Sequence, residues 1–90
     1  MKKAVITVVG KDCVGIIARV CTYLAANQVN ILDISQTIVQ EYFNMMMIVD
    51  IGKMEKDFLL VATELEKLGE EIGVIIKAQR EDIFDMMHRI

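Results

Sequence analysis

A short loop near the start of the chain carries residue types that could hold a small charged ligand. Residues 8–17 read Val8-Val9-Gly10-Lys11-Asp12-Cys13-Val14-Gly15-Ile16-Ile17 and join an apolar run to a run with helical spacing. A helix N-terminus presents unpaired backbone N–H groups and a partial positive charge, which suit a carboxylate. The carboxylate of Asp12 beside it could hold an ammonium group. The loop therefore indicates a receptor for an amino acid and says little about catalysis.

Each of these residues also has a purely structural interpretation. Asp12 could cap the helix, a role that stabilises by about 1 kcal/mol. Gly15 costs about 0.5–1 kcal/mol relative to alanine in a first turn, so a ligand or close helix–strand packing must require its missing side chain. Asn30, fifteen residues after Gly15, is typical of turns. Cys13 could be a redox-sensitive thiol, although an inert thiol is favoured. The conjunction of Asp12, Gly15 and Asn30 favours binding.

The remaining reactive side chains do not form a metal or cofactor motif. Cys13 and Cys21 lie eight residues apart, with the second inside an expected helix, and this separation does not fit disulfide geometry. The chain has no CxxC pair and no Cys/His ligand set, and His88 is its one histidine. We expect free thiols, no metal and no cofactor, in keeping with a cytoplasmic protein.

Composition excludes two classes of partner. The 10 basic residues are outnumbered by 13 acidic ones, and aromatic residues make up only 6% of the chain. Binding to a phosphate backbone needs several converging cations, so we expect no nucleic-acid partner. The longest uncharged run, 20–32, is too short and polar to span a bilayer, so we expect no membrane partner. The chain has 90 residues, 54% of them hydrophobic, and predicts one domain over 1–90 that self-associates.

Hydrophobic periodicity predicts the elements that position the loop. Strands are expected over 3–9, 30–40, 43–51 and 74–78, and helices over 13–26, 56–72 and, as a short C-terminal tail, 81–90. This order predicts an α+β fold, the ferredoxin-like βαββαβ two-layer sandwich. Right-handed crossovers place the first and third strands in the centre of the sheet.

Two strands carry information about assembly. The segment 30–40 alternates apolar and polar residues, which predicts a half-exposed strand. The segment 43–51 is apolar on both faces, since Met46 and Ile48 oppose an otherwise hydrophobic row. Both faces cannot lie under the helices of a two-layer sandwich. This excess predicts a homodimer, with the tail covering part of the sheet.

The loop residues 10–17, followed by Asn30-Ile31, resemble the ACT domain, a small regulatory module attached to many enzymes of amino-acid metabolism. The length and the tail 80–90 are similar to a group of small free-standing ACT proteins. The resemblance implies an amino acid bound between two subunits. Its implied contacts are Asp12, Cys13, Val14, Gly15 and Ile16 of one chain and Asn30 and Ile31 of the other. The commoner family pattern has arginine and proline where this chain has Cys13 and Val14.

Three functions follow as alternatives. The first is a dimeric regulatory module, not an enzyme, that binds an amino acid or similar metabolite and reports it to an effector protein. The second is an oligomerisation or protein-interaction module without a small ligand. The third is an acylphosphatase-like enzyme, which shares the split fold. It is disfavoured because Arg19 falls well inside the helix and the second glycine of the loop comes one residue late.

Overall fold

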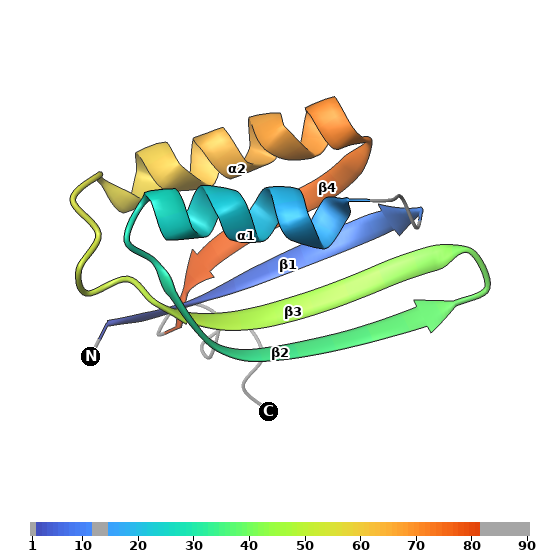
Figure 1. The fold of residues 1–90 in the computed structure, drawn as a ribbon, viewed down its shortest axis with the longest axis horizontal. Coiled ribbons are helices and arrows are strands. Elements are labelled where there is room, and N and C mark those ends of the chain that lie inside the picture. The colour runs from blue at the N-terminus through green and yellow to red at the C-terminus, as the bar shows by residue number, and fades with distance from the viewer. Residues whose placement is uncertain (1, 12–14, 82–90) are drawn as a thin grey trace.

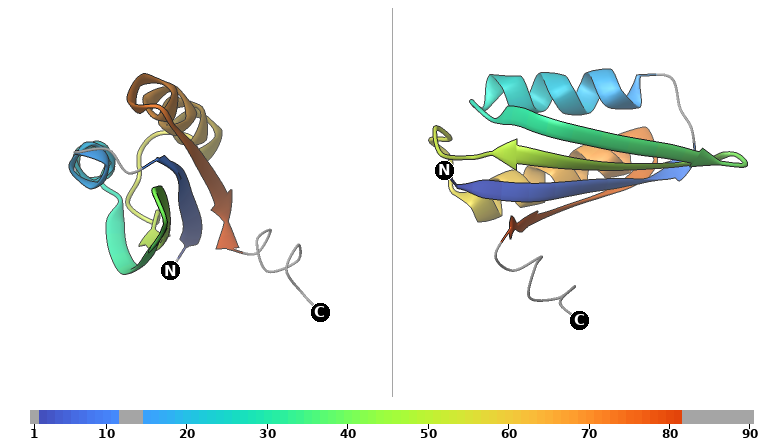
Figure 2. Two further views of the ribbon diagram at one scale, coloured as in Figure 1. Left: turned by 90° about the vertical axis from the view of Figure 1, so that its right-hand side faces the viewer. Right: turned by 90° about the horizontal axis from the view of Figure 1, so that it is seen from below.

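The protein folds as an antiparallel sheet covered on one face by two helices (Figures 1 and 2). The computed structural model describes residues 2–11 and 15–81. Along the chain these form β1 (Lys3–Lys11), α1 (Ile16–Ala26), β2 (Asn30–Val39), β3 (Tyr42–Asp50), α2 (Phe58–Ile72) and β4 (Val74–Arg80). The strand order is β2-β3-β1-β4. The predicted ferredoxin-like sandwich, with the first and third strands central, is confirmed. The tail helix expected over 81–90 lies outside the described residues, except for Glu81.

The core lies between the sheet and the helices. Alternate residues of the central strands point toward the helices and are buried, namely Ala4, Ile6, Val8, Phe43, Met45, Met47 and Val49. The helices contribute Ile16, Val20 and Leu24 from α1 and Val61 and Leu65 from α2. Burial of each such side chain contributes of order 1.5–3 kcal/mol before entropy is counted. No charged side chain is buried among the described residues.

The face of the sheet that points away from both helices is called the open face here. Met46 and Ile48 lie on it, because they alternate with the buried residues of β3. Val5, Thr7 and Val9 of β1 share this face, since their register partners are Ile48, Met46 and Asn44. The expectation that both faces of the third strand are apolar is therefore confirmed.

Strand β2 is more exposed than the half-exposed strand expected over 30–40. Every residue from Leu32 to Val39 is exposed. Ile34 and Ile38 pair with Met47 and Phe43 and so share the helix-facing side, yet they are 42% and 57% exposed. The cause is position, because β2 is an edge strand with a neighbouring strand on one side only, and its far end runs past the ends of the helices (Figure 1). One protomer leaves both sides of this strand uncovered.

Candidate functional site

Helix α1 begins after a glycine, which has no side chain of its own to cap the helix. The expected start was residue 13, but the helix begins at Ile16 with Gly15 at the N-cap. The Gly15 carbonyl accepts a hydrogen bond from the Arg19 N–H at 2.9 Å. Within residues 2–11 and 15–81, no side chain caps the first turn, and no acidic residue lies in that turn. The first N–H groups of a helix have no intrahelical acceptor, and the positive end of the helix dipole lies here. This end can therefore accept an anionic group.

The conformation of Gly15 explains its presence. Its φ of 89° is left-handed, a region that side chains with a Cβ enter only at a cost. A Cβ added at Gly15 would meet no atom of the described residues within 4 Å. We expected either a ligand or close helix–strand packing to explain this glycine. The explanation by close packing is wrong. The capping position is occupied by Gly15, and the expected cap Asp12 lies outside the described residues, as do Cys13 and Val14.

Two other predicted contact residues, Ile16 and Ile31, pack against the hydrophobic core. Ile16 is 2% exposed and packs in the main hydrophobic cluster. Only its backbone N–H is therefore available to a ligand. Ile31 is half-buried against the same cluster, whereas Asn30 is exposed. Sequence periodicity could have indicated this, because Ile16 stands one turn before the core residue Val20.

One protomer does not bring the two halves of the predicted site together. Lys11, which leads toward Gly15, pairs with Tyr42, and Tyr42 pairs with the last residue of β2. Asn30 pairs with Asp50 at the opposite end of the sheet. Helix α1 runs between these ends (Figure 1). Its 11 residues correspond to about 16 Å. A site that includes both Gly15 and Asn30 therefore requires two chains.

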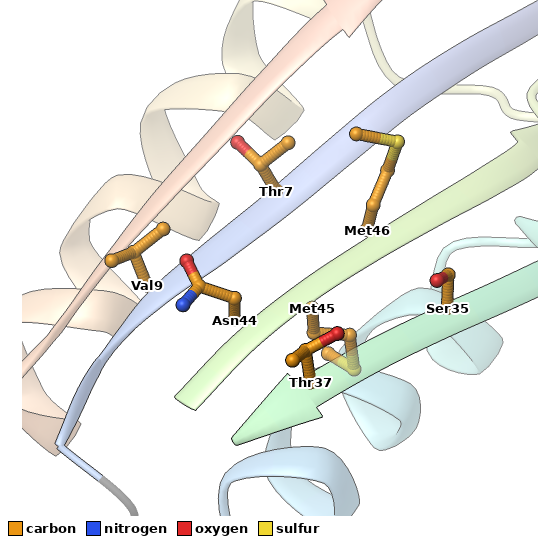
Figure 3. Close-up of a pocket in the computed structure, with 7 residues that line it drawn as sticks. All are labelled: Thr7, Val9, Ser35, Thr37, Asn44, Met45 and Met46. Carbon is orange, nitrogen blue, oxygen red and sulfur yellow. The ribbon is translucent and has the colours of Figure 1, made fainter. Parts of the chain in front are cut away.

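A shallow hollow on the open face was not predicted. It is lined by Thr7, Val9, Ser35, Thr37, Asn44, Met45 and Met46 and has a volume of ≈ 240 Å³ (Figure 3). Its polar atoms come from two threonines, a serine and an asparagine. It can hydrogen-bond neutral groups, but no lining residue carries the charge that an ammonium or carboxylate requires. The alternation of small polar residues in neighbouring strands is the signal that could have indicated it.

A polar bridge joins the two helices. The Tyr23 hydroxyl donates to Glu64, and Lys56 Nζ donates to the same carboxylate oxygen at 2.9 Å. Burial, the hydrogen bond and the carboxylate charge together raise the pKa of Tyr23 far above its usual value. The hydrogen bonds from Tyr23 and Lys56 lower the pKa of Glu64. Tyr23 of α1 and Glu64 of α2 therefore hold the two helices together.

Arg19 forms an ion pair of 3.0 Å with Glu71 of α2, so it does not serve the loop as an acylphosphatase arginine would. Within residues 2–11 and 15–81, no three acidic, cysteine or histidine residues are grouped to hold a metal ion. No helix found there has the length and apolar character needed to cross a bilayer.

Comparisons with known proteins agree with this architecture. The profile of the ACT domain matches residues 2–79. A UPF0237 protein of Bifidobacterium longum is 64% identical over 90 residues, which is 100% of both chains. The solved ACT domain protein from Streptococcus pneumoniae is 44% identical, with a TM-score of 0.82 over 93% of this chain and 94% of that one. The regulatory subunit of aspartate kinase from Thermus thermophilus, solved in its ligand-free form, is 30% identical, with a TM-score of 0.64 over 87% and 50%.

Proposed function

The chain belongs to the ACT domain family of regulatory domains, and from this premise we propose that it binds a free amino acid or a similar metabolite between two copies of itself. The observation that carries the proposal is the start of α1 at Gly15, where no side chain of the described residues caps the helix, and which lies at the same end of the sheet as the end of edge strand β2. The start of α1 provides one half of a ligand site, and the exposed edge of β2 allows a second chain to supply the other half.

The second half comes from pairing between β2 edges. An edge strand leaves a row of unpaired backbone groups, and a second copy can pair with it in the antiparallel sense around a two-fold axis. Antiparallel pairing puts the start of the partner's β2 beside the end of this β2. Asn30 and Ile31 of one copy then approach Gly15 and Ile16 of the other. The same contact covers the exposed helix-side residues Ile34 and Ile38.

The two halves have complementary roles toward a zwitterion. The ligand carboxylate is held by backbone N–H groups at the start of α1, where the helix dipole favours a negative charge. The ligand ammonium is held by Asp12 of the loop, and Cys13 and Val14 border it. The amide side chain of Asn30 in the second copy closes the site. Asn30 is exposed in the protomer, so it is available for this contact.

Regulation follows from the position of the ligand. A ligand shifts an equilibrium only through unequal affinity for its two states. An amino acid that bridges two chains favours the paired state over separate chains or a different pairing. An effector protein that binds one arrangement then senses the metabolite. We place this activity in the cytoplasm, where the free thiol of Cys21 stays reduced.

Calorimetric titration of the full chain with each common amino acid, combined with sedimentation velocity, tests the proposal. We expect saturable binding of at least one amino acid, with one ligand per chain and a shift toward the dimer. A dimer that binds none of them would instead favour a protein-interaction module, which the exposed β2 edge also supports. A monomer that binds none would contradict both functions.

A further inference from the structure

Strand β4 forms the edge of the sheet opposite to β2. It pairs with β1 in the antiparallel sense and has no other neighbouring strand in this sheet. In an antiparallel pair, the backbone N–H and C=O groups of alternate residues point away from the neighbouring strand. About half of the backbone groups of β4 therefore face outward, where they can pair with an added strand. The proposed dimer forms through β2, so it does not occupy the β4 edge.

A groove of ≈ 470 Å³ runs between the β4 edge and helix α2, which packs against β4. One wall is a single side of the helix, formed by Leu59, Ala62, Thr63 and Glu66. The other wall is formed by three consecutive residues of β4, 77–79. Successive strand residues point to opposite faces of a sheet, so three in a row can line one groove only along the outer edge of the strand. The groove therefore lies where an added strand would run.

Helix α2 is held close to β4 beyond one end of this groove. A Cβ added at Gly69 would lie 2.7 Å from the Val74 carbonyl oxygen and 3.1 Å from Ile76 Cγ1, so the missing side chain permits this close approach. The groove lies beside the earlier turns of α2, where Leu59 is 73% exposed. The Thr63 hydroxyl donates to the Leu59 carbonyl at 2.9 Å, so its hydrogen is already used within the helix. This part of the wall therefore suits an apolar side chain.

Two charged residues border the groove from different sides of the sheet. Lys77 is exposed and pairs with Thr7, so it belongs to the open face. It takes part in none of the ion pairs found within residues 2–11 and 15–81. Glu66 belongs to α2 and lies on the helix side of the sheet. Because side chains alternate along a strand, an added strand can place an acidic residue opposite Lys77 and its neighbours on the helix side, where Glu66 disfavours a second carboxylate.

Pairing of β4 with a second copy of itself is disfavoured by charge. Lys77 is the middle residue of this strand, which runs over Val74–Arg80. The antiparallel register that uses the whole strand therefore puts Lys77 directly opposite the same residue of the second copy. Like charges in directly opposite positions are destabilising. The same lysine favours a different chain that carries an acidic residue at this position.

We propose that β4 binds an extended segment of another protein, which adds to the sheet as a further strand. An acidic residue of this segment lies opposite Lys77, and an apolar residue beside it enters the groove next to Leu59 and Ala62. Main-chain hydrogen bonds provide the affinity, whereas the lysine and the groove provide the specificity. A contact with a single strand buries little surface, so it is weak and readily reversible. An effector protein then has a docking surface separate from the amino-acid site.

Fluorescence anisotropy with a synthetic peptide tests the proposal on the full chain. In the labelled probe, threonine and valine alternate and glutamate replaces the central threonine, whereas the matched peptide has lysine in place of this glutamate. We expect saturable binding of the glutamate peptide with a Kd below about 1 mM and about tenfold weaker binding of the lysine peptide. Lys77→Glu should reverse this preference. Lys67→Glu makes the same charge change at an exposed position of α2 outside the groove and should leave the preference unchanged.

Backbone methylation tests whether the peptide adds as a strand. The N–H groups of one alternate set of residues in an added strand face β4, and those of the other set face away from it. A glutamate peptide N-methylated on two valines and one N-methylated on two threonines should therefore differ in affinity by about tenfold or more. Equal binding of these two peptides, no saturable binding, or a preference for glutamate that persists in Lys77→Glu would each overturn the proposal. Neither preference depends on the amino-acid site, so both should also be found in Gly15→Ala.

Discussion

Gly15 and Asn30 stand at opposite ends of the same protomer, separated by the length of helix α1 (Figure 1). Gly15 occupies the N-cap of that helix and provides no side chain to cap its first turn, and Asn30 begins the exposed edge strand. If both contact one ligand, the ligand must lie between chains. The proposed function therefore depends on an assembly, and each half of the site can be altered separately.

The left-handed glycine predicts a selective loss of ligand binding. Gly15→Ala forces a Cβ into a conformation that costs about 1–2 kcal/mol, and relief of that strain moves the N–H groups at the start of α1. Gly73 is a matched control, because its φ is also left-handed and a Cβ there also meets nothing within 4 Å. Urea denaturation should show a similar loss of stability in Gly15→Ala and Gly73→Ala. Calorimetry should show weakened amino-acid binding only for Gly15→Ala. If both variants bound the amino acid equally well, the start of α1 would not be part of the ligand site.

Asn30 should contribute to binding without contributing to the fold. Its side chain is exposed, so Asn30→Ala should change the free energy of unfolding by no more than about 0.5 kcal/mol. Loss of a hydrogen bond to a charged ligand group should weaken binding about tenfold or more. Asn44→Ala, an exposed asparagine at the other end of β3, provides the control. If Asn30→Ala and Asn44→Ala bind the amino acid with the same affinity, the start of β2 does not contact the ligand.

The β2 edge should determine the oligomeric state. The double variant Ile34→Lys, Ile38→Lys puts two charges on a side of β2 that a partner would cover. Because both isoleucines are exposed in the protomer, its stability should change by only about 0.5 kcal/mol. Sedimentation velocity should then show a monomer. Leu59→Lys, a charge added at a position that is 73% exposed on α2, should leave the dimer intact. A dimer that survives the β2 double variant must use another surface.

The bridge between the helices predicts a pH-dependent contribution to stability. Tyr23→Phe removes the hydrogen bond to Glu64 and should cost about 1 kcal/mol near neutral pH. The pKa of Glu64 is lowered on folding from its ordinary value of 4.5, so its contribution is present above that pH and is lost as pH falls through the folded pKa.

The pKa of Tyr23 is raised on folding from its ordinary value of 10.0, so its contribution is present below that pH and is lost as pH rises through the folded pKa. Urea denaturation across pH should therefore show the largest difference between wild type and Tyr23→Phe in the middle of the range. Tyr42→Phe, at an exposed tyrosine, should track the wild type. A difference for Tyr23→Phe that did not vary with pH would indicate lost packing and not a lost hydrogen bond to a carboxylate.

The spacing of apolar residues predicted the fold, because each helix and strand here has the hydrophobic periodicity typical of its type. The two-sided apolar character around Met46 and Ile48 indicated a central strand, and β3 is central. The exposure of Ile34 and Ile38 could not be predicted, because burial of an edge strand depends on what lies beside it. Hydrophobic periodicity predicts the start of α1 three residues too early, since the left-handed conformation of Gly15 does not affect the spacing of apolar residues. The Tyr23–Glu64 bridge joins residues 41 apart in the chain and has no local signal.

Mixing two defective chains tests most directly whether one site is built from two copies. Homodimers of Gly15→Ala and of Asn30→Ala each carry the defect in both sites. In a heterodimer of the two, one site collects both substitutions and the other has neither. Two-fold symmetry then predicts that a 1:1 mixture, equilibrated by dilution and reconcentration, regains about a quarter of the wild-type amino-acid binding capacity. Heterodimers that form, as native mass spectrometry can verify, but regain no binding would contradict a ligand site shared between chains.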